Sequence, residues 1–196
     1  MDAEKSSEKA FSFLLHPCKL KPMPEETALI RDKIIEAAAG KAAEAGWTRA
    51  MLCAAAQEAG YEPVMAEAVF PGGALDAVNH FADYADRGML RLLEEINPGD
   101  LRVRDRIRTA VMIRFEFLNP HKDAVRQAAG LWAVPPRGVH AARSVWRTSD
   151  RVWTWAGDMS SDYNYYTKRG LLSGIISPSM LVWFNDDDPE MRKTAA

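Results

Sequence analysis

Apolar residues recur at helical spacing along almost the whole chain. Ile30, Ile34, Ala38, Ala42 and Ala45 lie three or four positions apart, the period that places side chains on one face of an α-helix. Clusters of glycine, proline and asparagine divide the pattern into segments. It predicts helices over about 27–45, 50–59, 62–70, 74–96, 107–118, 122–133, 135–156 and 163–176, and a last short piece beginning at Pro178. Since no segment shows the alternation of a β-strand, we predict an all-α fold.

The breaks in this pattern predict four parts. Residues 1–26 combine charged residues with three prolines and are expected to form a disordered N-terminal arm. Residues 27–72 are expected to form a degenerate helix-turn-helix, and residues 73–185 a second, larger helical domain. The charged end of the chain, residues 186–196, is expected to be flexible.

The first three predicted helices have the lengths and spacing of a helix-turn-helix. Their layout resembles the N-terminal part of TetR-type regulators, in which an aromatic residue, here Phe70, ends the recognition helix. However, no lysine or arginine occurs between Arg49 and Arg87, whereas Glu62 and Glu67 lie in the recognition segment. DNA binding requires cations against the phosphates and base-reading side chains in the groove. We therefore expect no nucleic-acid partner. The alternative function is a ligand-responsive TetR-type regulator, which would require a DNA-binding dimer.

Charge is distributed unevenly, although the net charge is only −2. Residues 28–100 carry 6 Lys/Arg against 12 Asp/Glu, and residues 101–155 carry 11 against 4. Arginines alternate from Arg102 to Arg108, which favours a solvated basic helix face that could also reach anionic headgroups. Two cysteines without a CxxC pair and the lack of a long apolar run predict a cytoplasmic protein with at most peripheral contact to the inner membrane.

The sequence contains none of the common catalytic signatures, such as GxGxxG, a P-loop, GxSxG or HExxH. Asp76, His80 and Asp83 share a helical face and could in principle hold a metal ion, which leaves a metal-dependent enzyme as a third hypothesis. A solvated polar stripe with helical ion pairs explains the same spacing. We predict that the chain is not an enzyme and has no metal site and no cofactor.

Aromatic residues gather in the C-terminal half, where five of the six tryptophans occur from Trp132 onward. Trp146 and Trp153 are seven positions apart, which favours a shared place in the core. Tyr163, Tyr165 and Tyr166 cannot all face the same way, because adjacent positions on a helix diverge by about 100°. At least one tyrosine should face outward beside Lys168 and Arg169, as at a protein interface or a lipid boundary.

The segment from Trp155 to Leu172 reads WAGDMSSDYNYYTKRGLL. It resembles the signature of the COQ-nine family of ubiquinone-biosynthesis accessory proteins, which is approximately AGD-x-STDFNWYT-[KR]-R. The resemblance extends more loosely over about 28–191. It implies a TetR-like fold, a homodimer, a hydrophobic cavity for an isoprenoid lipid or quinone precursor, and assistance to the di-iron hydroxylase that acts on demethoxyubiquinone.

The resemblance also implies residue roles. The hydroxylase-binding patch would fall on Trp155, Asp162, Asn164, Tyr165 and Tyr166, where Tyr165 stands in place of a frequent tryptophan. The lipid cavity would be lined by apolar residues of the four helices after Gly99, namely Ile107, Val111, Phe115, Trp146, Trp153, Leu172 and Ile176. Family members usually continue into an amphipathic helix that lies on the membrane. This chain ends at Ala196, so we expect that helix to be missing or cut.

Overall fold

The computed structural model describes residues 25–195 as helices joined by short connections, with no strand in this range. The all-α prediction is confirmed. Residues 1–24, which hold most of the predicted arm, lie outside the described part. The helices are α2 (Glu25–Ala45), α3 (Arg49–Glu58), α4 (Pro63–Val69), α5 (Ala74–Leu93), α6 (Val103–Leu118), α7 (Lys122–Trp132), α8 (Gly138–Trp155), α9 (Tyr163–Phe184) and α10 (Arg192–Ala195), with 3₁₀ turns at Pro98–Asp100 and Asn119–His121.

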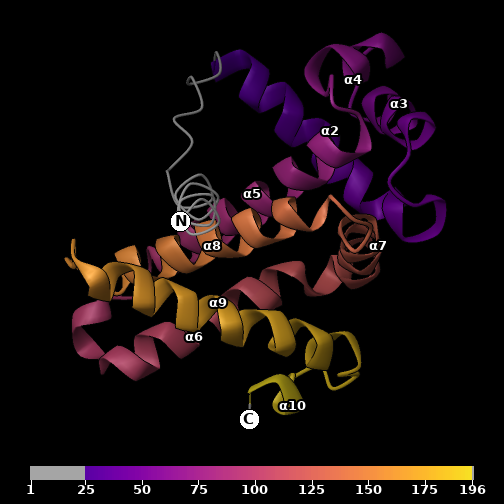
Figure 1. Ribbon diagram of the computed structural model, residues 1–196. Helices are drawn as coiled ribbons and strands as arrows, with labels where there is room; N and C mark the ends of the chain where they lie inside the picture. The colour runs from indigo at the N-terminus through magenta and orange to yellow at the C-terminus, as the bar shows by residue number, and fades with distance from the viewer. Residues whose placement is uncertain (1–24, 196) are drawn as a thin grey trace, which may run out of the picture.

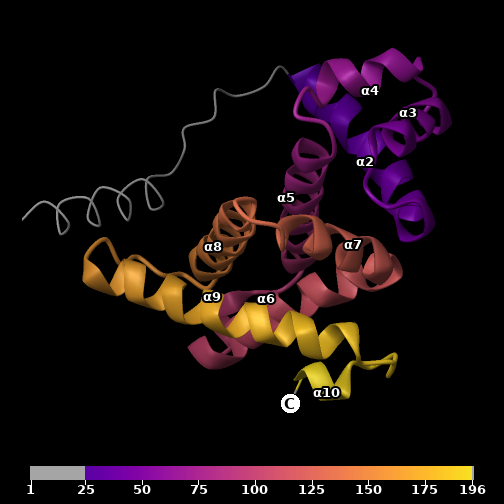
Figure 2. The same ribbon diagram turned by 45° about the vertical axis from the view of Figure 1, so that its right-hand side comes forward.

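The first three helices form a compact unit at one end of the molecule (Figures 1 and 2). Helix α2 ends where Gly46 adopts a positive φ of 63°, a conformation that glycine tolerates without steric cost. The Thr48 hydroxyl then caps α3 by accepting a hydrogen bond from the Met51 N–H at 3.1 Å. Pro63 begins α4, where a missing N–H is harmless. The predicted boundaries of these three helices are right to within a few residues.

Helix α5 connects this unit to the C-terminal helices (Figure 2). Its buried face is made of Ala77, Val78, Phe81, Ala85, Met89 and Leu93, spaced by three and four positions. Gly88 lies on the same helix where α6 approaches. A Cβ at this position would clash with the Phe117 ring of α6, so any larger residue here would have to displace that ring.

Two groups of buried side chains form the core. The larger group runs from α2–α4 through α5–α7 and includes Phe115, which lies 5.3 Å from Trp183 between ring centroids. The smaller group lies between α5, α6, α8 and α9. We call it the α5–α9 cluster; its buried members are Met89, Leu93, Ala110, Val152, Leu172 and Ile176.

A buried network of charges crosses the same helices. Asp86 of α5 is completely buried and accepts hydrogen bonds from Arg114 of α6 and Thr148 of α8, both at 2.8 Å. Arg147 and Arg151 of α8 approach its second carboxylate oxygen at 3.2 and 3.3 Å. Removing one member of such a network leaves a buried charge without compensation, so the network ties α5, α6 and α8 together.

The structure differs from the predicted break at Pro178, because α9 continues through this residue to Phe184. Proline removes the N–H that would bond to the Gly174 carbonyl. Gly174 and Pro178 are both exposed, so water can solvate that carbonyl. On the opposite face, Ile176 and Trp183 are buried on either side of Pro178 and hold the two halves of the helix in line.

The segment predicted to be a flexible end, 186–196, packs against α9 as far as the structure describes it (Figure 1). Asp186 is buried, and its Oδ2 accepts hydrogen bonds from both the backbone N–H and the hydroxyl of Thr194 at 2.8 Å. Met191 is buried in the larger core group. Local polarity favours a tail, but these contacts anchor it.

Stability should fall in mildly acidic solution because of His80. Burial and the positive charge of Arg31 lower the pKa of His80 below 6.5, although its Nε2 lies 2.7 Å from Asp32. Since the unfolded chain then takes up the proton first, the free energy of unfolding is highest above about pH 6.5 and declines as the pH falls below that value.

Urea denaturation between pH 7.5 and pH 5 measures this decline. His80→Gln keeps an N–H for Asp32 and should flatten it. Burial also lowers the pKa of His121, so His121→Gln should flatten the remaining part of the decline. A decline that His80→Gln leaves unchanged would contradict the assignment to His80.

Candidate functional site

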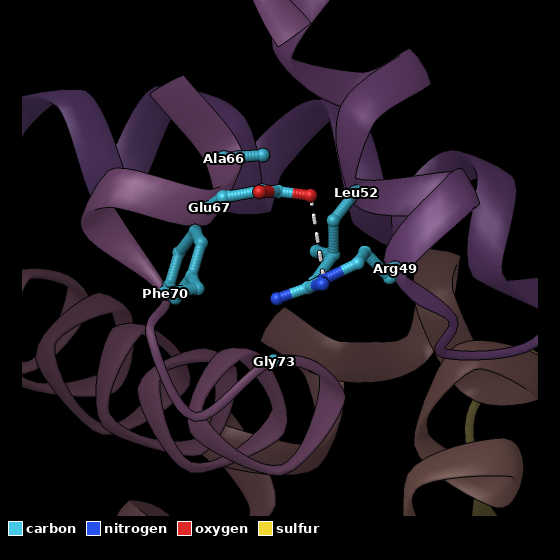
Figure 3. A pocket seen from close by; sticks show the side chains of 6 residues that line it. All are labelled: Arg49, Leu52, Ala66, Glu67, Phe70 and Gly73. Carbon is cyan, nitrogen blue, oxygen red and sulfur yellow. Dashed lines mark ion pairs between the residues drawn. The ribbon is translucent and has the colours of Figure 1, made fainter. Parts of the chain in front are cut away.

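The outer face of the helix-turn-helix unit has its cations paired with acids. Arg49 of α3 lies 3.5 Å from Glu67 of α4, across a shallow indentation that Leu52 and Phe70 also border (Figure 3). The space in it that could hold a water molecule is about 0 Å³, so the indentation offers no room for a ligand. Lys41 pairs with Glu58 at 2.6 Å. These two ion pairs offset the positive charge that a phosphate backbone would require.

The three residues considered for a metal site each contact another charged side chain of the protein. Asp76 pairs with Arg31 at 2.7 Å, and His80 contacts Asp32. Asp83 accepts from Arg87 and Arg151, both at 2.8 Å. Arginine charges lower the pKa of Asp83 although burial opposes this. Within residues 25–195 no group of three metal-binding side chains converges.

The predicted lipid-contacting residues do not all meet. Leu172 and Ile176 are buried members of the α5–α9 cluster, and Ile107, Val111 and Trp153 pack against it. Phe115 belongs to the larger core group. Trp146 lies outside both groups of buried residues and stacks on Tyr166, with 6.4 Å between ring centroids. A hollow of about 140 Å³ occurs elsewhere, between α2 and the start of α7, and is lined by residues such as Gly40 and His121.

Helix α9 is apolar on two sides. One side contributes Leu172 and Ile176 to the α5–α9 cluster. The other side is exposed to solvent, where Leu171 and Ile175 are 66% and 59% exposed and Leu181 and Val182 follow farther along. No charged residue occurs between 170 and 184. We call the exposed apolar residues Leu171, Ile175, Leu181 and Val182 together the outer face of α9; exposed apolar surface of this kind is typical of a binding site.

The signature segment begins with a tight turn after α8. Gly157 has a φ of 87°, and the Asp158 N–H bonds back to the Trp153 carbonyl at 3.0 Å, which closes the helix end. Arg106 of α6 donates to the Ala156 carbonyl at 2.8 Å. One of the alternating arginines therefore supports this turn, whereas Arg102, Arg104 and Arg108 are exposed.

The charged residues of the signature are largely internal. Asp158 accepts from Lys168 at 2.6 Å and from Arg169 at 2.9 Å. Burial opposes ionisation of Asp158, but these hydrogen bonds hold the pKa of the carboxyl well below its usual value. Arg169 is only 2% exposed and also donates to Asp150 of α8 at 2.6 Å. The expectation that Arg169 lies at the surface beside a tyrosine is wrong, because two carboxylates draw it inward.

The three tyrosines separate as the helical geometry requires. Tyr163 and Tyr166 are 81% and 45% exposed, which confirms that at least one tyrosine faces outward. Met159, in the connection before α9, is 92% exposed. Tyr165 is half-buried, and its hydroxyl donates to Asp150 at 3.0 Å. Its ring meets that of Tyr166 edge to face, with centroids 5.1 Å apart.

The predicted partner patch is brought together in part. Asp162, Asn164 and Tyr166 are exposed at the start of α9. The Oδ1 atom of Asp162 accepts from the Asn164 N–H at 3.0 Å and caps the helix. Trp155 instead packs against the α5–α9 cluster.

Two features of the site were not predicted from the sequence: the contacts of the buried Arg169 with Asp150 and Asp158, and the outer face of α9. The uncharged run 170–184 was the available signal for the second. The first had no local signal, because it depends on how α8 lies against α9.

The two acids of the signature should differ in what they contribute to stability. Asp158→Ala leaves Arg169 buried beside one partner fewer and should lower the free energy of unfolding by about 3 kcal/mol. Asp162→Ala, the matched control, removes only a helix cap and should cost about 1 kcal/mol. Urea denaturation of the three proteins measures both losses, and equal losses would contradict the structural role of Asp158.

Comparison with known proteins agrees with this signature. Residues 139–196 match the sequence model of the COQ9 family. The ubiquinone biosynthesis protein COQ9, mitochondrial, of Drosophila melanogaster is 31% identical over 169 residues, which is 84% of this chain and 52% of that protein. The proteins of the same name from Rattus norvegicus and Homo sapiens are 27% and 26% identical over 177 residues, 87% of this chain and 56% and 55% of theirs.

The chain thus spans about half the length of the curated relatives it matches. Those relatives are named mitochondrial proteins. Among the helices of residues 25–195, none is both long enough and apolar enough to cross a membrane. The match to the COQ9 sequence model includes the signature segment, and the COQ9 protein of Drosophila melanogaster matches 84% of the chain, so this chain is similar to COQ9 proteins over most of its length.

Proposed function

We propose that this chain is a non-catalytic accessory protein of ubiquinone biosynthesis, which binds an isoprenoid quinone precursor and presents it to the demethoxyubiquinone hydroxylase. The names of its relatives support the pathway. The lipid-binding part of the proposal rests on one observation: helix α9 is apolar both toward the protein and toward solvent.

The prenyl chain lies along the outer face of α9 in this proposal. Leu171 and Ile175 are its first contacts, because they are more than half exposed and one helical turn apart. Covering this face removes apolar area from water, worth about 25 cal/mol per Å² before the costs of binding. Beneath it, Leu172 and Ile176 fill the α5–α9 cluster. An apolar ligand makes no directional contacts here, so we expect the protein to discriminate only weakly between prenyl chains of different length.

Charge on the outer face should abolish lipid uptake. We expect the double substitution Leu171→Asp and Ile175→Asp to lower transfer of a prenylated quinone from liposomes by about tenfold or more, since a carboxylate is costly to cover with an apolar chain. Because both positions are exposed, the fold should persist.

Val64→Asp is the matched control, because Val64 is 67% exposed on the distant helix α4. It should leave transfer unchanged. Delipidated wild-type protein that takes up no prenylated quinone would refute lipid binding itself. An equal loss in both variants would refute the role of α9.

The hydroxylase is proposed to contact the surface at the start of α9. Exposed aromatic side chains are frequent energetic centres of protein interfaces, and Tyr163, Tyr166 and Met159 are exposed together with Asn164. Tyr166 also stacks on Trp146. Both surfaces are formed by α9, so in this proposal one helix carries the ligand and meets the enzyme.

Tyr166→Ala should weaken binding of purified demethoxyubiquinone hydroxylase by about tenfold, which surface-immobilised titration can measure. Leu92→Ala serves as control, since Leu92 is exposed to a similar extent, 49% against 45%, at the end of α5. Unchanged binding of the Tyr166 variant would place the contact elsewhere.

A DNA-binding role is not part of the proposal. Helix α4 contains no lysine or arginine, and Val64 is its most exposed large side chain. Arg49 and Lys41 nearby are paired with Glu67 and Glu58. These features support a helix-turn-helix unit that serves as a structural support for the C-terminal helices.

A further inference from the structure

The buried guanidinium of Arg169 reaches three parts of the structure at once. Its Nε donates to Asp150 of α8, and one terminal nitrogen donates to Asp158 of the preceding turn. The same nitrogen lies 3.2 Å from the Tyr165 carbonyl, one helical turn earlier on α9. Only the planar, forked geometry of arginine serves several acceptors in this way.

Arg169 also fixes the ring of Tyr165. The guanidinium carbon lies 3.5 Å from the ring centroid, a close cation–π contact. At the far end of the ring, the hydroxyl donates to the same Asp150 oxygen that accepts from Arg169. The side chain is therefore held at its face and at its tip, and its rotamer freedom is lost before any partner binds.

This order extends to the surface through aromatic contacts. The ring of Tyr165 packs edge to face on that of Tyr166, with an interplanar angle of 81°. Tyr166 in turn stacks on Trp146 of α8. Tyr166 is 45% exposed and Arg169 is 2% exposed, so this chain of contacts runs from a buried cation to a surface aromatic.

The contacts between Arg169 and Tyr165 are not needed to hold α8 against α9, because other contacts already join the two helices. Asp158 already has Lys168 as a second cation. The two helices are also joined by the hydrogen bond from the Trp153 indole to the Lys168 carbonyl and by the Ser149–Ser173 hydroxyl pair. A lysine at position 169 could keep one ion pair, but it could not stack on the tyrosine ring and reach both carboxylates.

We propose that Arg169 is a positioning residue: through Tyr165 it holds Tyr166 in a fixed orientation and so pre-organises this surface for a protein partner. The inference deepens the proposed function and rests on it for the identity of the partner. Pre-organisation acts on affinity because binding no longer has to order these side chains.

The test compares Arg169→Lys with Arg114→Lys. Arg114 is the matched control, since it is also buried and donates from Nε to a buried carboxylate, that of Asp86, at 2.8 Å. Urea denaturation establishes that both variants fold and how much stability each loses. Affinity for the purified hydroxylase and NMR of ¹³C-labelled tyrosine rings, assigned with Tyr165→Phe and Tyr166→Phe, are then measured.

Arg169→Lys should weaken hydroxylase binding by about tenfold, the effect of releasing two ordered side chains. It should also shift the ring resonances of Tyr165 and Tyr166 toward those of mobile tyrosines. Arg114→Lys should change neither readout. Unchanged tyrosine resonances in Arg169→Lys, or an equal loss of affinity in both variants, would overturn the inference. Wild-type protein that does not bind the hydroxylase refutes the proposed partner, and the tyrosine resonances then decide the positioning role alone.

Discussion

Three arginines and a threonine surround the carboxylate of Asp86 in the middle of the molecule. The group has no access to solvent, so its burial is compensated by the contacts with Arg114, Arg147 and Arg151, which α6 and α8 bring to it. This requirement places α5, α6 and α8 relative to one another. The α5–α9 cluster, the floor on which α9 packs, lies between these same helices.

Helix α9 owes its double-sided character to this floor. Leu172 and Ile176 fill the α5–α9 cluster, and their neighbours Leu171 and Ile175 are left in solvent because no helix in residues 25–195 covers that side. Pro178 does not interrupt the helix, since the carbonyl it leaves without a donor faces water. A helix that is uncharged from 170 to 184 and has one face free suits the apolar ligand that we propose.

The signature segment combines two kinds of residue. Asp158 and Arg169 are buried and form the frame, whereas Asn164 and Tyr166 are exposed and form the surface. Tyr165 lies between the two kinds, with its ring on the guanidinium and its edge against Tyr166. A family resemblance alone does not separate these roles. The exposed fractions and the hydrogen-bond partners do.

Much of the secondary structure of this protein follows from the local pattern of its amino-acid sequence. Apolar spacing determined that the chain is helical, and glycine, proline and capping residues determined where most helices begin and end, because these effects act within one or two turns. The absence of cations from 50 to 86 was likewise legible in the sequence. The tertiary structure alone decided which of Ile107, Phe115 and Trp146 share a cluster and that 186–195 is anchored. It also decided that Arg169 points inward. Each of these features depends on partners from distant segments. Asp150 of α8, for example, contacts Arg169, but no local spacing specifies the distance between them.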